Sequence, residues 1–165
     1  MQKLYIIRHG FAGKKIEDEA LDVERPLTKA GQKQIKKLAK SLKKLEVSFD
    51  RVLTSPLLRA KETAEIVNAA CCDIKKVKVT DLLLPDSSST HLIKFLNQKF
   101  KAANEVAIVG HEPFLSLFAS FCLSKSKNSY VNLKKGGILM LEVDKVITPG
   151  GCRLSWLMEP KKKSK

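Results

Sequence analysis

Short apolar runs alternate with longer amphipathic segments along most of the chain. We expect the apolar runs to form strands, at residues 3–8, 50–54, 76–80, 105–110, 137–143 and 152–158. We expect the amphipathic segments to form helices, at residues 28–46, 56–70, 88–102 and 113–123. Strands that alternate with helices favour a mostly parallel sheet covered by helices on both faces, which is an α/β fold.

Local patterns support individual elements of this plan. Ile35, Leu38 and Leu42 recur at helical spacing, opposite a row of lysines. The run "VAIVGH" is apolar and β-branched without interruption, which is typical of a strand buried on both faces. The dipeptide "SP" at Ser55 and Pro56 indicates a cap and a first-turn proline for the next helix.

The end of the chain has a different pattern. The stretch "ITPGGC", residues 147–152, predicts a turn that joins the last two strands as an antiparallel hairpin. We therefore predict a three-layer α/β/α sandwich with a mostly parallel central sheet and an antiparallel C-terminal hairpin. Residues 1–158 would form one domain, and residues 159–165 a basic, disordered tail. Residues 11–27 and 85–90 are expected to be loops.

The formal net charge of +14 is the unusual feature of the composition. Seven lysines fall in the first long helical segment: Lys29, Lys33, Lys36, Lys37, Lys40, Lys43 and Lys44. A solvated helix face and the "KKKSK" end account for most of the excess charge. The alternative is attraction to an acidic protein, to phosphate esters or to nucleic acid. No nucleic-acid-binding motif accompanies the charge, so a basic nucleic-acid-binding module is only a distant alternative.

The cysteines and the hydropathy pattern bear on the compartment. The four cysteines, Cys71, Cys72, Cys122 and Cys152, form no CxxC pair. We expect them to be reduced thiols in a cytoplasmic protein. No apolar stretch reaches the roughly 18 residues that span a bilayer, so no transmembrane segment is expected.

Candidate catalytic residues fall where predicted strands end. Arg8, His9 and Gly10 end the first strand, His111 ends "VAIVGH", and Arg59 lies one turn into the helix after residues 50–54. In an open parallel sheet, ligands collect at the carboxyl ends of the strands. Two arginines, two imidazoles and nearby helix N-termini would repel one another without an anion, and a phosphoryl group fits them. The glycine would let the backbone approach this ligand.

The third histidine is not a candidate catalytic residue. His91 lies in a serine-rich stretch, and we expect a surface or capping residue there.

Several of these segments resemble a known family. They are "LYIIRHGFA", "ERPLTKAGQKQ", "DRVLTSPLLRAKETAEIV" and "VAIVGHEP". Their order and spacing, from residue 3 to about residue 115, are similar to those of the histidine phosphatase superfamily, which includes the phosphoglycerate mutases. The ending "LSWLMEP" and the short length are most similar to the SixA-like phosphohistidine phosphatases. The resemblance implies the phosphoglycerate mutase-like fold.

The resemblance also implies roles for the candidate residues. His9 would be the nucleophile that becomes a transient phosphohistidine, and Arg8, Arg59 and His111 would hold the phosphoryl oxygens. Neither a metal nor another cofactor is implied, and the sequence offers no Asp, Glu and His cluster that would hold a metal.

The general acid is where the sequence departs from the family. Many members place a glutamate shortly after the third strand, whereas this chain has "VTDLLLPDSSS" there. Asp81 is the nearest candidate, with Asp86 behind it, and the alternative is that both are loop residues without a catalytic part. Phosphohistidine releases an imidazole, whose conjugate acid has a pKa near 6.5, so that reaction needs an acid far less than an alkyl ester does.

The leading hypothesis is a metal-independent phosphatase that acts on phosphohistidine in a signalling protein, such as a histidine-containing phosphotransfer domain. The chain lacks the long insertion that covers small substrates in larger relatives, and an open site suits a protein substrate. The alternative within enzymes is a phosphatase of small phosphomonoesters, such as sugar phosphates.

Overall fold

A mixed sheet lies at the centre of the computed structural model, which describes residues 2–71 and 77–160. The strands are β1 (Lys3–Arg8), β2 (Arg51–Thr54), β3 (Lys78–Val79), β4 (Glu105–Gly110), β5 (Ile138–Glu142) and β6 (Arg153–Met158). Their order across the sheet is β3-β2-β4-β1-β5-β6. The first four strands in this order pair in parallel, whereas β5 pairs antiparallel with both β1 and β6. The predicted parallel sheet and the C-terminal antiparallel hairpin are confirmed.

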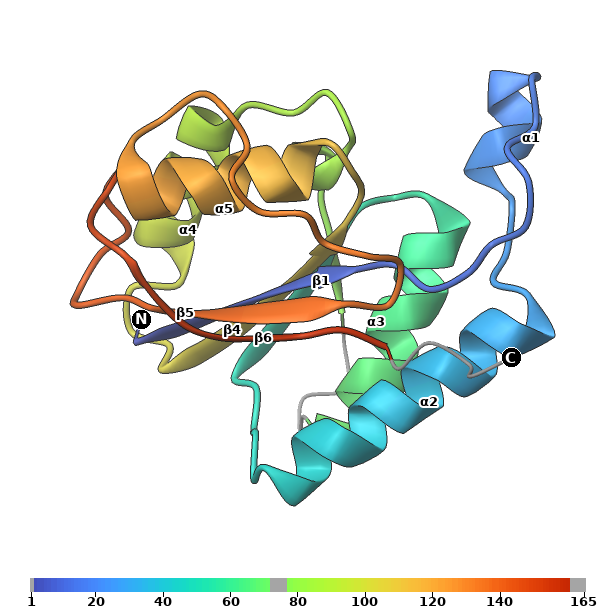
Figure 1. Cartoon of the computed structure of the whole chain (residues 1–165), viewed down its shortest axis with the longest axis horizontal. Helices are drawn as coiled ribbons and strands as arrows, with labels where there is room; N and C mark the ends of the chain where they lie inside the picture. Colours follow the sequence, from blue (N-terminus) through green and yellow to red (C-terminus); the bar gives the residue numbers. More distant parts are fainter. Residues whose placement is uncertain (1, 72–76, 161–165) are drawn as a thin grey trace.

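Helices cover both faces of this sheet. They are α1 (Glu19–Val23), α2 (Lys29–Lys44), α3 (Leu58–Cys71), α4 (Ser89–Lys99) and α5 (Phe114–Ser124). Figure 1 shows α2 and α3 on one face, α4 and α5 on the other, and α1 projecting from one end of the molecule. The predicted three-layer sandwich is therefore confirmed.

Side-chain alternation along β1 divides the core into two halves. Leu4 and Ile6 point into the cluster beneath α4 and α5, and Tyr5 and Ile7 into the cluster beneath α2 and α3. All four side chains are buried, which is the reason that this central strand reads as a continuous apolar run. Strand β4 is buried in the same way.

The helix starts differ from the sequence prediction. The helix expected at residue 56 begins at Leu58, because the hydroxyl of Ser55 accepts a hydrogen bond from the Leu57 N–H at 3.2 Å within a turn that precedes the helix. Pro113 likewise precedes α5 instead of lying in its first turn, and its peptide bond to Glu112 is cis.

Other boundaries are shorter than predicted. The helix expected at 88–102 ends at Lys99, and the strand expected at 76–80 consists of Lys78–Val79, with residue 76 outside the described residues. The region 11–27, predicted as a loop, contains α1, capped by the Asp18 carboxylate. A 3₁₀ helix, η1 (Asp81–Leu83), follows β3.

Some of the remaining predictions concern the chain end and the cysteines. Glu159, the first residue of the predicted tail, forms an ion pair with Lys134, and residues 161–165 lie outside the described residues. Cys122 and Cys152 are buried free thiols, Cys71 is buried as well, and Cys72 lies outside the described residues. Among the described helices, none is long and apolar enough to cross a membrane.

Candidate active site

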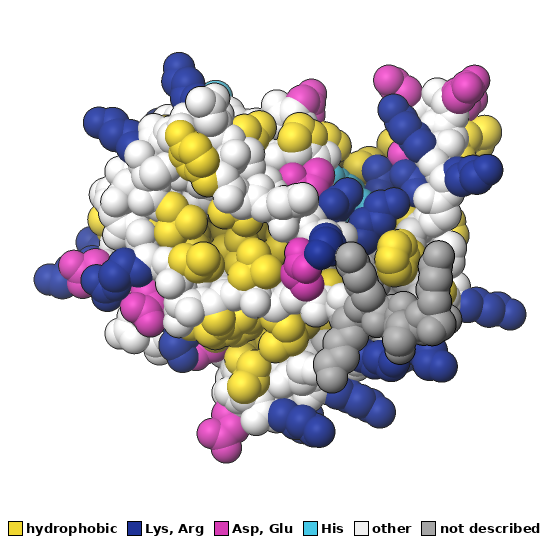
Figure 2. All heavy atoms as spheres, in the orientation of Figure 1, with side chains coloured by type: hydrophobic (Ala, Val, Ile, Leu, Met, Phe, Trp, Pro, Cys, Tyr) yellow, Lys and Arg dark blue, Asp and Glu magenta, His cyan; other side chains and the backbone are white. Residues whose placement is uncertain are grey.

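The four predicted catalytic residues come together at one edge of the sheet. Arg8 is the last residue of β1 and His9 follows it, His111 follows β4, and Arg59 lies in the first turn of α3. Because β1 and β4 pair in parallel, their carboxyl ends meet, and the ring centroids of His9 and His111 are 5.0 Å apart. Figure 2 shows histidine surface at the bottom of a hollow beside α1, surrounded by Lys and Arg side chains.

The hydrogen bonding of His9 leaves one ring nitrogen available for reaction. Nδ1 lies 2.7 Å from the carbonyl oxygen of Gly10, which can only accept, so Nδ1 carries the proton and Nε2 keeps its lone pair. Burial lowers the pKa of His9 to about 3, and the charges of Arg59 and Arg8 add to this effect. His9 is therefore a neutral imidazole near pH 7, with the protonation state that a nucleophile requires.

His111 has the complementary arrangement. Its Nε2 lies 2.6 Å from the hydroxyl of Ser55, whose oxygen already accepts the Leu57 N–H. If the hydroxyl donates to Nε2, the proton of His111 is on Nδ1, which is buried and has no partner among the described residues. The pKa of His111 is lowered to about 2, mainly by burial, and the positive charge of Arg59 acts in the same direction. The Nδ1–H is thus a free donor for an anion.

The two arginines are each fixed through one nitrogen. Arg8 donates from its Nη1 to the carbonyl of Leu133 at 2.8 Å, and Arg59 donates from its Nη1 to the carbonyl of Asp22 at 2.8 Å. The Nε atoms of both arginines are buried without a partner among the described residues. An unsatisfied buried donor costs about 1–3 kcal/mol. Together with Nδ1 of His111, these donors make a site whose hydrogen bonding is completed by the oxygens of an anion.

Asp22 and Arg25 belong to this arrangement, although sequence reasoning missed them. Asp22, on α1, accepts hydrogen bonds from Arg25 at 2.7 Å and pairs with Arg59 at 3.2 Å. The Arg25 hydrogen bond is the main reason that the pKa of Asp22 lies well below its usual range. Arg25 stands in the segment "ERPLTKAGQKQ" and could have been singled out, but Asp22 is one of several acids in a charged stretch.

Gly10 has a packing role in this structure. A Cβ at this position would lie 2.8 Å from Ile35 of α2, so glycine allows the helix to approach. Its N–H donates to the hydroxyl of Thr63 at 3.2 Å. The expected part of Gly10 in phosphate binding remains a prediction.

The candidate acids lie differently from the four central residues. Asp81 begins η1, and both Asp81 and Asp86 are exposed. Within the described part of the chain, no hydrogen bond or ion pair joins either carboxylate to the two histidines or the two arginines. Glu112 is a further carboxyl group, half-buried next to His111, whose pKa burial raises and whose oxygen accepts a hydrogen bond from Ser116 at 2.7 Å.

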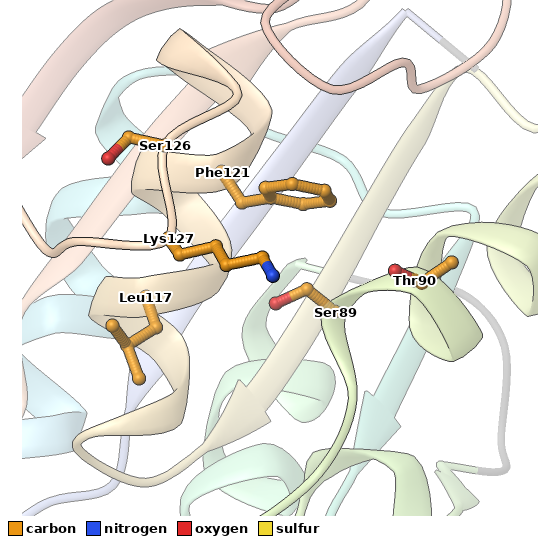
Figure 3. A pocket seen from close by; sticks show the side chains of 6 residues that line it. All are labelled: Ser89, Thr90, Leu117, Phe121, Ser126 and Lys127. Atoms are coloured by element: carbon orange, nitrogen blue, oxygen red, sulfur yellow. The ribbon is translucent and has the colours of Figure 1, made fainter.

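His91 and a second pocket lie outside this cluster. His91 is exposed in the first turn of α4, as predicted. The pocket lies between α4 and α5, where Figure 3 shows it lined by Ser89, Thr90, Leu117, Phe121, Ser126 and Lys127. None of the four central residues lines it, so it is separate from the catalytic cluster.

Comparisons with known proteins identify the family of this chain. Residues 4–83 match the model of the histidine phosphatase superfamily (branch 1). An uncharacterized protein of Picosynechococcus sp. is 38% identical over 141 residues, which cover 84% of each chain. Phosphohistidine phosphatase SixA of Escherichia coli is 28% identical over 164 residues, 96% of this chain and 94% of that protein.

A solved structure extends the similarity to the fold. The protein histidine phosphatase SixA complexed with tungstate superposes with a TM-score of 0.81 at 25% identity, covering 96% of this chain and 97% of that one. The predicted phosphoglycerate mutase-like fold is thereby confirmed. With the paired histidines and arginines at the carboxyl edge of its sheet, this chain belongs to branch 1 of the histidine phosphatase superfamily and is a phosphatase similar to SixA.

Proposed function

We propose that this protein hydrolyses phosphohistidine on a phosphorylated protein, through a covalent intermediate on His9. The observation that carries the proposal is the state of His9, a buried, neutral imidazole whose Nδ1 is held by the Gly10 carbonyl. Buried donors of Arg8, Arg59 and His111 without partners among the described residues stand at the same edge of the sheet. A nucleophile next to donors of this kind is suited to phosphoryl transfer.

In the first step, Nε2 of His9 attacks phosphorus opposite the leaving group. The new N–P bond forms as the old N–P bond breaks, and the electron pair of the old bond goes to the departing imidazole nitrogen. Arg8, Arg59 and His111 donate hydrogen bonds to the equatorial oxygens, where charge is greatest during transfer. The departing imidazole leaves neutral when its other ring nitrogen carries a proton, so no general acid is required.

In the second step, water attacks the phosphorus of phosphorylated His9. The N–P bond breaks, its electron pair returns to Nε2, and orthophosphate leaves with the protons of the water. His9 is then neutral again and Nδ1 has kept its proton throughout, because the Gly10 carbonyl continues to accept it.

Similarity to SixA supports the choice of phosphohistidine, since the relative is named a phosphohistidine phosphatase. We propose a signalling protein, such as a histidine-containing phosphotransfer domain, as the physiological partner, and the cytoplasm as the compartment. Hydrolysis of small phosphomonoesters is the second candidate, and Glu112 favours it. Burial raises the pKa of this carboxyl group beside His111, which is the property of a group that can protonate an alkoxide.

A substrate panel tests the proposal. Phosphohistidine protein, free phosphohistidine, an aryl phosphate and sugar phosphates would be compared under identical conditions, with His9→Ala as the inactive control. We expect the highest kcat/KM with the phosphohistidine protein. A higher kcat/KM with a sugar phosphate would replace the proposal with the second candidate.

A further inference from the structure

The segment after Leu133 is hydrogen-bonded directly to the end of β1, the strand that precedes His9. The Arg8 side chain donates to the Leu133 carbonyl at 2.8 Å, and the Arg8 N–H donates to the Gly137 carbonyl at 3.0 Å. Between these two points, the Gly136 N–H donates to the carbonyl of His9 at 2.9 Å. The one remaining stretch, residues 134 and 135, is therefore held at the rim of the His9 site.

The backbone that follows this stretch lies close to Gln34 of α2. Gly136 has a φ of +72°, and a Cβ there would lie 2.5 Å from the Gln34 side chain. Gln34 in turn donates from Nε2 to the carbonyl of Lys135 at 2.7 Å. Because α2 holds Gln34, the turn that carries Lys135 is anchored to both α2 and β1.

Two adjacent lysines on this turn have different environments. Lys134 is exposed and forms its ion pair with Glu159. Lys135 is half-buried, and no ion pair to it occurs within residues 2–71 and 77–160. Burial lowers the pKa of Lys135, and the charges of Arg8, Arg25 and Arg59 lower it further. Lys135 thus stands on a turn next to Arg8, and no acidic side chain within the described residues forms an ion pair with it.

An anion is the expected partner for the ammonium group of Lys135. Other residues, however, already provide the hydrogen-bond donors in the innermost part of the site. Arg59 and His111 are buried, with exposed fractions of 6% and 2%, and with Arg8 they hold the unpartnered donors. Asp22 offsets part of the charge of Arg25 and Arg59. Lys135 is more exposed than Arg59 and His111, which places it toward the solvent side of the site, where the part of the substrate that is not transferred would lie.

We propose that Lys135 binds a second anionic group of the substrate, next to the phosphoryl group that is transferred. Lys135 is then a specificity-determining residue for substrates with two neighbouring anionic groups. The identity of the second group rests on the proposed function. In a phosphohistidine protein, this group is an acidic side chain that neighbours the phosphohistidine.

A pair of non-hydrolysable ligands tests the inference without any turnover. Methylphosphonate carries one anionic group, and phosphonoacetate is the same phosphonate with a carboxylate added. Their dissociation constants would be measured by calorimetry at low ionic strength with the wild type, Lys135→Met and Lys134→Met. Methionine keeps the apolar stem of the lysine, and Lys134→Met is the matched control. Thermal unfolding of each variant checks that the fold is retained.

We expect the wild type to bind phosphonoacetate more tightly than methylphosphonate. Lys135→Met should lose about tenfold in affinity for phosphonoacetate, as expected for one charge-assisted hydrogen bond, and less than twofold for methylphosphonate. Lys134→Met should change neither affinity. An equal loss for both ligands would place Lys135 on the transferred group instead, and a wild type that gains nothing from the carboxylate would overturn the inference.

A second arm uses phosphohistidine peptides whose neighbouring residues are Glu in one version and Gln in the other. Lys135→Met should lower kcat/KM for the Glu peptide and leave that for the Gln peptide within about twofold. If neither peptide is hydrolysed by the wild type, the proposed function fails, while the ligand pair still decides the role of Lys135.

Discussion

The hydroxyl of Ser55 lies 2.6 Å from Nε2 of His111 and joins the end of β2 to the end of β4. Both groups are buried, so the hydrogen bond fixes the orientation of the imidazole ring. It also determines which ring nitrogen carries the proton that His111 would offer to a phosphoryl group in the proposed mechanism.

Ser55→Ala should therefore slow phosphoryl transfer. The substitution leaves Nε2 of His111 buried without the Ser55 hydroxyl, and the proton of His111 is no longer fixed on one ring nitrogen. We therefore expect kcat to fall by about tenfold. Ser55→Thr keeps a hydroxyl and should recover part of the loss. Ser41→Ala removes the exposed hydroxyl that donates to the Lys37 carbonyl on α2 and serves as the control. Steady-state rates of the four proteins check this, and unchanged kcat in Ser55→Ala would contradict it.

A labelling experiment identifies the nucleophile. With a radioactive phosphohistidine or aryl phosphate substrate, rapid quenching in alkali should trap acid-labile phosphate on His9, because phosphohistidine survives in base. His9→Ala should give no label and no turnover, and a chelator should leave the wild-type label unchanged. Label on another residue, or turnover that persists in His9→Ala, would end the proposed mechanism.

Asp22 is expected to act through Arg59. Asp22→Asn removes the charge that holds the Arg59 guanidinium, so kcat/KM should fall by about tenfold. In an Arg59→Ala background the same substitution should change kcat/KM by less than about twofold, because the partner is already absent. Asp18→Asn, which keeps a capping side chain on α1, is the control. Equal effects of Asp22→Asn in both backgrounds would mean that Asp22 does not work through Arg59.

The buried histidines should make the free energy of unfolding depend on pH. The pKa of His9 is about 3 and that of His111 about 2 in the folded protein, against about 6.5 in the unfolded chain. Between about pH 6.5 and 3 the unfolded chain binds more protons, so stability falls as pH falls. At pH 5.5 each histidine should contribute a loss of about 1 kcal/mol relative to neutral pH.

Urea unfolding at about pH 7.5 and pH 5.5 measures this dependence. His111→Asn should reduce the difference between the two pH values, whereas His91→Asn, at an exposed position, should not. Orthophosphate should oppose the loss, since a bound anion favours the charged imidazoles. An identical pH dependence in the wild type and His111→Asn would show that His111 is not held neutral.

Substitution of the candidate acidic residues distinguishes the two proposed enzymatic activities. Asp81→Asn and Glu112→Gln each remove an acid and keep the shape of the side chain. If either group protonates the leaving oxygen, its substitution should slow alkyl phosphomonoester hydrolysis by about 10²-fold and barely change phosphohistidine hydrolysis. For a protein suited to phosphohistidine, the wild type should already be slow with alkyl esters. A fast alkyl ester rate that collapses in either variant would favour the phosphomonoester candidate.

The sequence by itself determined the layered fold and its central residues. Alternating apolar runs and amphipathic segments require strands and helices in turn, and a continuously apolar strand such as Leu4–Ile7 must be covered on both faces. Since parallel strands end at one edge, the sequence places His9 and His111 at the same edge of the sheet, and they meet there because β1 and β4 are neighbours. These conclusions depend on local pattern and on a general rule of sheet geometry.

Only the tertiary structure decided which polar groups complete the site. Asp22, Ser55 and Lys135 are distant from one another in sequence, and nothing in their local pattern links them to the two histidines and two arginines. Asp22 reaches Arg59 because α1 projects over the sheet edge, and Ser55 reaches His111 because β2 and β4 are neighbours. Lys135 is less exposed than Lys134 and lies in a turn that β1 and α2 hold through hydrogen bonds. Such pairings depend on long-range backbone contacts, and hydrophobic periodicity does not encode them.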